Sequence, residues 1–510
     1  MDNYKLKLSI FISLIIVLLV CLYYGIFGFS VSYLSETEIK ETRKLKENLI
    51  SYFKINDIDT VYDDENGIYY YSIPSEYENK KYTLKLNLDS EYKYKIVKHN
   101  TNIITVDYNK TYKIIIYNDK NYYEAKLKLT NLPLISISTD ADITDSPTNS
   151  VFKYINPSNL DNVLTYNSKI HIRGASSKFF DKKAYKVEMY NNDYENEKLV
   201  NISNFYYGSS FILDAMYRDN SKVRNMLATN IWNDIAKSFT NVNIYSEYVE
   251  VFINNKYIGL YVFTEPVNRR NLNLNKSSQN NTSVVLKSSN WILPNFYGYY
   301  NLIDDVYEGY ELKYPNNEEL FNTAWNSILT KLSKYYPSKT ENNYNTINNI
   351  FDLENYMNLV LYNSFIDNED NGMVKNNYFY QKTLNDKIYI QPWDMEYSMG
   401  LGFSATAPGG YEKTPDDYKR VTFGINHPNS KRITEELINK YWEFRKTVFS
   451  EEYLDNLLKE YKEKLNKGAA KRDSKIWLEY DIEEEIEDVK TWLHNRIEVY
   501  DDYVRGLENE

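Results

Sequence analysis

The residues best suited to chemistry lie between positions 367 and 394. Phosphoryl transfer requires a carboxylate that orients and deprotonates the acceptor hydroxyl, together with an amide and a second carboxylate that hold Mg²⁺ against the phosphates. Asp370, Asn376 and Asp394 provide this set in the order used by protein kinases, although the first two are six residues apart here instead of five. The alternative interpretation is a polar turn followed by a buried Trp-Asp pair.

A second group of residues could bind an anion. Arg173 ends a short predicted strand and is followed by Gly-Ala-Ser-Ser, a stretch in which small residues let backbone N–H groups approach a phosphate. Arg173 itself can bind phosphate through two donors. Lys182, Lys183 and Lys186 lie on the next predicted strand, where kinase-like folds carry a phosphate-binding lysine. Alternatively, the first segment is a tight β-turn and the lysines form a solvated charged edge.

The elements that must position these residues include strands and helices. Residues 170–173 and 184–189 are predicted strands on either side of the small-residue loop, and a helix is predicted after a cap at Asn220 or Ser221. The other predicted elements are hairpins over 248–264 and 377–390, a helix from a cap at Asp352 to about Ile366, and a helical tail over 432–507 with a charged loop near 467–475. This mixture predicts an α+β domain over residues 131–510.

Residues 50–130 predict a separate β module. Apolar side chains fall on period two in several short runs, for example at Tyr112, Ile114 and Ile116, and turn residues separate the runs. Short strands with regular turn signals predict a small β-sandwich module. The charged, helix-prone residues 29–49 predict a stalk that leads into this module.

The N-terminus predicts a membrane anchor. Residues 8–28 carry no charge and are long enough to cross a bilayer. The apolar run ends in bulky side chains and not in a small-residue cleavage site, so residues 1–28 are interpreted as a short tail and an uncleaved transmembrane signal anchor. Lysines precede the predicted span and basic residues follow it, so the positive-inside rule does not decide the orientation of the span in the membrane. A short N-terminal tail favours a single-pass protein with its large domain on the outer face of the cell membrane.

Composition argues against several other classes of function. The chain has 510 residues and a net charge of −11, which disfavours nucleic acid as a partner because sequence-independent binding needs a cationic face. A single cysteine excludes an intramolecular disulfide and thiolate metal clusters. The four histidines include no two at metal-ligand spacing, which disfavours a zinc hydrolase.

Five sequence blocks resemble the spore coat protein H (CotH) kinase family. In the family's order, the blocks are 172–177 with 182–188, 219–224, 248–254 with 257–265, 375–380 and 392–394. The resemblance covers about residues 131–505. It implies an atypical protein-kinase-like, two-lobed domain that binds ATP with Mg²⁺ or Mn²⁺ and phosphorylates Ser or Thr of partner proteins, including spore-coat proteins. Fungal relatives act as surface invasins, so the fold alone does not decide the role.

The resemblance also implies roles for the residues around the predicted acidic loop. Asp370 matches the catalytic aspartate, whereas Asn376 and Asp394 match the metal-binding pair. Asp367 competes with Asp370 because the same loop carries both aspartates. Glu396 stands where the family often repeats an aspartate, which departs from the family's pattern.

Nucleotide-binding residues are implied in the same way. Lys186 or its neighbour Lys183 matches the nucleotide lysine, and Glu265 ends the strand that would form the hinge beside adenine. The phosphate loop would consist of Arg173, Gly174 and Ser176.

Two classes of function follow from this sequence. The first is a membrane-anchored atypical Ser/Thr protein kinase that acts on surface or spore-envelope proteins and contacts the lipid bilayer through residues 8–28. The second is a non-catalytic cell-surface adhesion or scaffold protein that retains the CotH fold. Retention of Asp370, Asn376, Asp394 and a strand lysine together favours the kinase.

Overall fold

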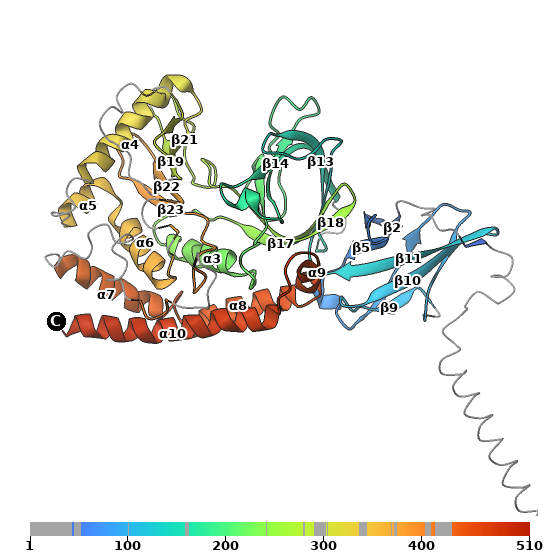
Figure 1. Cartoon of the computed structure of the whole chain (residues 1–510). Helices are drawn as coiled ribbons and strands as arrows, with labels where there is room; N and C mark the ends of the chain where they lie inside the picture. The colour runs from blue at the N-terminus through green and yellow to red at the C-terminus, as the bar shows by residue number, and fades with distance from the viewer. Residues whose placement is uncertain are drawn as a thin grey trace, which may run out of the picture. The chain divides into compact units, whose positions relative to one another are not determined.

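The computed structural model divides into two compact units (Figure 1). The first consists of the described residues within Met1–Ser138, Lys153–Leu164 and Phe252–Tyr257, and the second of those within Thr139–Phe152, Thr165–Val251 and Ile258–Glu510. The described residues are 43–44, 53–99, 101–158, 163–240, 242–278, 281–289, 302, 304–335, 344–368, 370–371, 375–402, 410–413 and 431–509.

The first unit is built from β-strands. Its strands include β1 (Arg43–Lys44), β2 (Lys54–Ile55), β3 (Ile58–Asp59), β4 (Val61–Asp63), β5 (Ile68–Ser72), β6 (Lys81–Thr83), β7 (Leu86–Asn87), β8 (Lys93–Ile96), β9 (Ile103–Thr105), β10 (Thr111–Tyr117) and β11 (Asn121–Thr130). The largest sheet has the order β4-β5-β11-β10-β8, with β1 also paired to β11, and smaller sheets have the orders β3-β2-β7 and β6-β9. Ile114 of β10 lies opposite Ala125 of β11, and alternate side chains of both strands are buried. The predicted β-rich region before the large domain is therefore confirmed.

The predicted membrane anchor lies outside the described residues. Residues 8–28 are not among them, and of the predicted stalk only Arg43–Lys44 is described, as β1. Within the described part of the chain, no helix combines the length and the apolar character needed to cross a membrane.

A closed barrel forms the first part of the large domain, and most of it belongs to the second unit. Its strands are β12 (Leu134–Ser138), β13 (Thr148–Ile155), β14 (Val163–Arg173), β15 (Ala184–Tyr190), β16 (Ser210–Asp214), β17 (Ser246–Ile253) and β18 (Lys256–Thr264), in the order β12-β13-β14-β15-β16-β18-β17. The last residue of β14, Arg173, lies opposite the first residue of β15, Ala184. The small-residue loop is thus held by two paired strands at one end of the barrel.

A five-stranded sheet forms the second part of the large domain. Its strands are β19 (Val284–Ser288), β20 (Val306–Tyr307), β21 (Tyr310–Tyr314), β22 (Asn377–Gln381) and β23 (Tyr389–Pro392), in the order β20-β21-β19-β22-β23. The predicted hairpin is present, because β22 and β23 pair in antiparallel fashion with Asn377 opposite Pro392. Residues on either side of this hairpin therefore lie at the same end of the sheet.

In the described part of the chain, four α-helices lie between strands of the large domain in the sequence. The first turns of two of them test the predicted helix caps. These helices are α3 (Arg224–Ala236), α4 (Phe321–Tyr335), α5 (Tyr344–Ile350) and α6 (Leu353–Phe365). Asp352 accepts a hydrogen bond from the backbone N–H of Asn355, so the predicted cap of α6 is confirmed. The predicted caps of α3 are wrong, because the Ser221 hydroxyl donates to one carboxylate oxygen of Asp219, and the other oxygen of Asp219 accepts the backbone N–H of Arg224.

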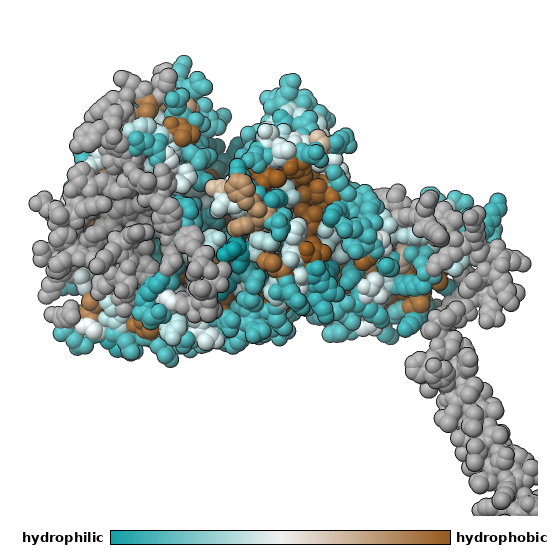
Figure 2. Space-filling model, viewed as in Figure 1, coloured by the Kyte–Doolittle hydropathy of each residue, from teal (hydrophilic) through white to brown (hydrophobic). Residues whose placement is uncertain are grey.

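The C-terminal part is helical, with α7 (Lys431–Arg445), α8 (Glu451–Leu465), α9 (Ala469–Ile476) and α10 (Ile482–Glu508). The surface along α8 and α10 is mostly hydrophilic (Figure 2), because the apolar side chains of α10 recur every three or four residues and are buried against the unit. Together with the sheets, these helices confirm the α+β class of the large domain.

The predicted charged loop near 467–475 is wrong, because α9 occupies most of it. Arg472 binds both carboxylate oxygens of Glu250 on β17 at 2.7 Å, and Asp473 binds the ammonium of Lys182 at 2.7 Å. The Lys222 Nζ atom is 4.0 Å from the other oxygen of Asp473. These five buried residues are called the α9 cluster here. These charged side chains pair with one another inside the protein. A sequence pattern does not reveal such pairing.

Candidate active site

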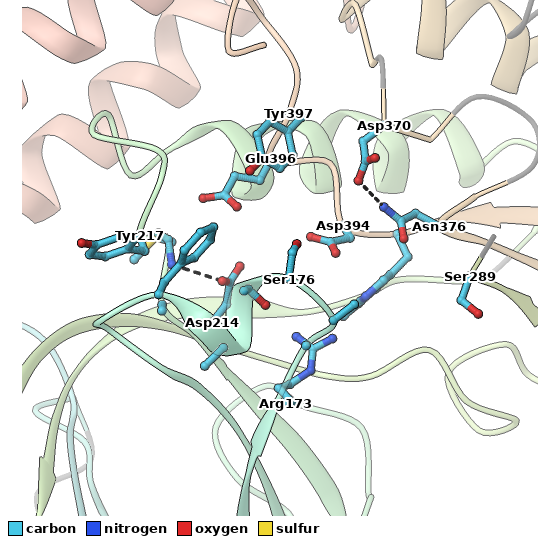
Figure 3. Close-up of a pocket in the computed structure, with 18 of the residues that line it drawn as sticks. Arg173, Ser176, Asp214, Tyr217, Ser289, Asp370, Asn376, Asp394, Glu396 and Tyr397 are labelled. Carbon is cyan, nitrogen blue, oxygen red and sulfur yellow. Dashed lines mark hydrogen bonds between the residues drawn. The ribbon is translucent and has the colours of Figure 1, made fainter. Parts of the chain in front are cut away.

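A cavity of about 580 Å³ lies in the second unit, between the barrel and the five-stranded sheet (Figure 3). The barrel contributes Arg173, the small-residue loop and the end of β16, whereas the opposite wall comes from β19, β21 and the segments around β22 and β23. Its volume is in the range of cavities that bind small molecules. The sequence segments predicted to bind phosphate and to carry the acidic residues therefore meet in one cavity.

Asp370 is held in this cavity by two direct neighbours. Its side chain is only 4% exposed. One oxygen accepts a hydrogen bond from the Asn376 Nδ2 atom at 2.8 Å, and the other accepts one from the Lys375 Nζ atom at 2.6 Å. The amide group of Asn376 thus presents its nitrogen to Asp370, which leaves its oxygen for another partner.

Backbone contacts connect the Asp370 loop to the segment that carries Asp394. The Asn371 side chain donates to the carbonyl oxygens of Asn376 and Trp393, at 3.3 and 2.8 Å. The backbone N–H of Trp393 also donates to the carbonyl of Asn376, at 2.9 Å. These bonds position Asp394, the next residue, beside the Asp370–Asn376 pair (Figure 3).

Asn376 and Asp394 share an uncommon backbone conformation. Their φ angles are 54° and 59°, in the left-handed region, where asparagine and aspartate are tolerated better than most residues. Such conformations concentrate at functional sites because the surrounding structure must maintain them. The backbone N–H of Asn376 donates to the carbonyl of Ser288 on β19 at 2.9 Å, which provides part of that support.

The environment of Asp394 is crowded with charge. Its side chain is exposed at the cavity surface, yet the enclosing protein partly desolvates it and raises its carboxyl pKa. The carboxylates of Asp214 and Asp370 add to this rise, whereas Arg173 and Lys287 oppose it. A divalent cation at this position would relieve the repulsion between the carboxylates.

The two aspartates of the acidic loop have different surroundings. Asp370 lines the cavity, whereas Asp367 does not. Both carboxylate oxygens of Asp367 lie 3.3 Å from the Lys413 Nζ atom, and a Cβ atom added to Gly410 would come within 2.2 Å of one of them. Asp367 is therefore enclosed by the segment around residue 410, which leaves Asp370 as the loop aspartate that a substrate could reach.

The predicted phosphate loop lies in the cavity wall. Arg173, Gly174 and Ser176 all line it. Gly174 has a φ of 110°, which is strained for any residue with a side chain, and an added Cβ atom would displace the Ser177 hydroxyl, 1.9 Å away. The loop can therefore approach a ligand through its backbone.

The predicted nucleotide lysines are not brought to the cavity. Lys183 donates to the carbonyl oxygens of Lys178 and Phe180, and Lys186 pairs with Glu188 at 2.7 Å. Lys182 does line the cavity, but its ammonium is bound to Asp473 in the α9 cluster. Lys182, Lys183 and Lys186 are thus all bound to protein atoms.

Glu265 also lies away from the cavity. Its carboxylate accepts hydrogen bonds from the backbone N–H groups of Tyr206 and Tyr245, and its side chain is buried. Burial raises its pKa to about 7, although both hydrogen bonds oppose this rise. These contacts indicate a structural role in joining the end of β18 to its neighbours.

Sequence reasoning assigned no role to several charged cavity residues, among them Asp214, Glu396 and Lys287. Asp214 ends β16 and accepts hydrogen bonds from the Met216 N–H and the Asn225 side chain. Glu396 accepts one from the Asp219 N–H, and burial together with nearby carboxylates raises its pKa. Lys287 lies on β19. Glu396 lies two residues after Asp394, so a sequence motif can point to it. Asp214 and Lys287 belong to no local motif.

Among the described residues, no three or more histidine, cysteine, aspartate or glutamate side chains gather closely enough to form a metal cage. The oxygen atoms available near Asp394 are carboxylate and amide oxygens, which suit a hard cation. Mg²⁺ usually binds through one or two carboxylates plus phosphate oxygens, so this set fits a metal that arrives with a nucleotide.

Comparison with known proteins supports one family. A family model described as CotH kinase protein matches residues 170–500, which include every residue that lines the cavity. No curated protein matches the chain.

Proposed function

The chain belongs to the CotH kinase protein family, and we propose that it transfers the γ-phosphoryl group of ATP to Ser or Thr side chains of other proteins. The observation that carries this proposal is the hydrogen-bonded Asp370–Asn376 pair beside Asp394, in a cavity whose opposite wall carries Arg173. This arrangement matches the parts that phosphoryl transfer requires.

Asp370 would accept the proton of the acceptor hydroxyl. Its two oxygens are already oriented by Asn376 and Lys375, so the carboxylate would not need to reorganise when the acceptor arrives. Lys375 would stay beside Asp370 as the proton is transferred. The hydroxyl oxygen would then attack the terminal phosphorus as the bond to the leaving diphosphate breaks.

Asn376 and Asp394 would hold the metal, with Mg²⁺ or Mn²⁺ as the candidates. A bound cation would neutralise phosphate charge as it moves to the leaving oxygen. The Asn376 nitrogen is bound to Asp370, so its amide oxygen is the atom that can coordinate. Arg173 and the backbone of the small-residue loop would hold the phosphates from the barrel side.

We further propose that the barrel and the helical part act as the two lobes of a kinase-like domain. The cavity between the barrel and the five-stranded sheet supports this view. Residues 8–28 would anchor the protein in the membrane with its large domain on the outer face, a proposal supported by their uncharged sequence. The partners would then be surface or spore-envelope proteins.

The test is incubation of the full-length protein with labelled ATP, Mg²⁺ or Mn²⁺, and a Ser-rich basic acceptor. We expect transfer of label by the wild type and by Asp367→Asn, but not by Asp370→Asn, which keeps the shape of the side chain without its basicity. Wild-type protein that binds nucleotide but transfers no label would support the adhesion or scaffold role instead.

A further inference from the structure

Four cations line the cavity, and only two of them have partners. Lys182 is bound to Asp473, and Lys375 is bound to Asp370. The side chains of Arg173 and Lys287 form no hydrogen bond or ion pair within the described part of the chain. We infer that Lys287 binds the terminal phosphates of a nucleoside triphosphate together with Arg173, an inference that rests on the proposed function.

The position of Lys287 in the sheet supports this role. It lies on β19, the central strand, opposite Glu311 on β21 and Tyr378 on β22. The next residue, Ser288, accepts the backbone N–H of Asn376. Because a residue within a sheet is rigidly placed, Lys287 is fixed relative to the proposed metal-binding residues.

Lys287 and Arg173 reach the cavity from different sheets. Arg173 ends β14 of the barrel, and both cations act on the same carboxylate, that of Asp394. Two cations that line the cavity from different sheets, together with a carboxylate in the same cavity, suit a phosphate chain that carries a metal ion. Lys182, Lys183 and Lys186 cannot take this role while they remain bound to protein atoms.

Keeping the Lys287 ammonium charged in the cavity costs free energy when no anion is bound beside it. The side chain is half-buried, and burial lowers its pKa, an effect that Glu311 opposes. Glu311 forms its own ion pair with Lys313, which is exposed on the same strand. A partly desolvated ammonium gains most from a ligand that brings negative charge into the cavity.

The competing explanation is that Lys287 only balances the carboxylates of the cavity. In that case, removing it would lower stability and leave phosphate binding unchanged. Lys287→Met removes the charge and keeps most of the side-chain length, whereas Lys287→Arg keeps the charge. Lys313→Met is the matched control, because it removes an exposed cation from the neighbouring strand.

The experiment measures the dissociation constants of ATP, ADP and inorganic tripolyphosphate for the full-length protein in Mg²⁺, alongside its melting temperature. We expect Lys287→Met to weaken ATP and tripolyphosphate about tenfold or more, and ADP much less, because a charge-assisted hydrogen bond to the terminal phosphate is lost. Lys287→Arg should stay within a few-fold of the wild type. Lys313→Met and Lys186→Met should bind like the wild type.

The outcomes separate this inference from the proposed function. Label transfer by the wild type, combined with unchanged ATP binding by Lys287→Met, would overturn the inference and leave the kinase role intact. Lys287-dependent binding of ATP and tripolyphosphate without any label transfer would support the inference and overturn the kinase role. A wild-type protein that binds none of the three ligands would overturn the inference.

Discussion

The α9 cluster and the cavity use the same kinds of charged residue in opposite ways. In the α9 cluster, Arg472 and Lys182 each bind a carboxylate at 2.7 Å, and all of these side chains are buried. In the cavity, Arg173 and Lys287 lack such partners within the described residues, and Asp394 is exposed. Charges that are satisfied inside the protein stabilise the fold, whereas unsatisfied charges around a cavity remain available to a ligand.

The largest expected effects are losses of phosphoryl transfer when the cavity aspartates are replaced. Asp394→Ala should lower the transfer rate about a thousandfold or more and weaken Mg-ATP binding, because metal-assisted stabilisation is worth several kcal/mol. Asp370→Asn should lower transfer by about 10²–10⁴-fold while nucleotide still binds, because the amide cannot accept a proton. Labelled transfer and nucleotide titrations would measure both.

The control for these two variants is Asp367→Asn, which changes the aspartate that does not line the cavity. The melting temperature without ligand should fall slightly for Asp394→Ala, because alanine tolerates the left-handed φ at position 394 less well than aspartate does. If Asp370→Asn kept most activity while Asp367→Asn lost it, the assignment within the loop would be wrong.

The next largest effect should appear in the α9 cluster as a loss of stability. Arg472→Leu leaves Glu250 buried without its partner, which costs about 3–5 kcal/mol of unfolding free energy. Urea unfolding followed by circular dichroism would measure it. The double variant Arg472→Leu/Glu250→Leu should recover most of the loss. An equal loss in the double variant would show that packing, and not charge pairing, holds α9.

Glu265 tests a buried charge that has hydrogen bonds but no cation. Its pKa is raised to about 7 from an ordinary value near 4.5, so the folded protein holds this proton more tightly than the unfolded chain. Stability from this group is therefore complete below its ordinary pKa and is lost as the pH rises through about 7, by about 3 kcal/mol in all.

Unfolding free energies measured from pH 5 to pH 8 would reveal the Glu265 effect. Glu265→Gln has no charge to gain, so its stability should fall less over this range than that of the wild type. Parallel pH profiles for the two proteins would contradict the expectation.

The smallest expected effect is at Gly174, in the cavity wall. Gly174→Ala adds a Cβ atom against Ser177 in a left-handed conformation, so the loop must shift at a cost of about 1–3 kcal/mol. ATP binding measured by calorimetry should weaken about tenfold, which corresponds to about 1.4 kcal/mol. Gly506→Ala is the control, because nothing lies within 4 Å of an added Cβ atom there. Equal ATP affinities in the two variants would contradict a phosphate-binding role for the loop backbone.

Local features of this fold could be predicted from the sequence, and long-range ones could not. Asp352 caps α6 through a residue three positions away, and the β22–β23 hairpin closes over a short turn. By contrast, α9 looked like a solvated loop because its partners, Glu250 and Lys182, are 222 and 291 residues away.

The candidate site follows the same rule. Asp370, Asn376 and Asp394 could be grouped because one loop and one hairpin connect them. Lys287 could not be found, because only the pairing of β19 with β22 brings it to Asn376. The choice among the lysines near β15 also missed Lys182, the one of these three that lines the cavity, because its position depends on the distant Asp473 that binds its ammonium.

The left-handed backbone at positions 376 and 394 limits which residues these positions can accept during evolution. Asparagine, aspartate and glycine fit such φ angles best, whatever the chain does with ATP. A descendant that had lost catalysis would still be selected, through its stability, to keep Asn376 and Asp394. Across related sequences, the residues at positions 376 and 394 would therefore persist after activity is lost, and their presence alone would not identify an active kinase.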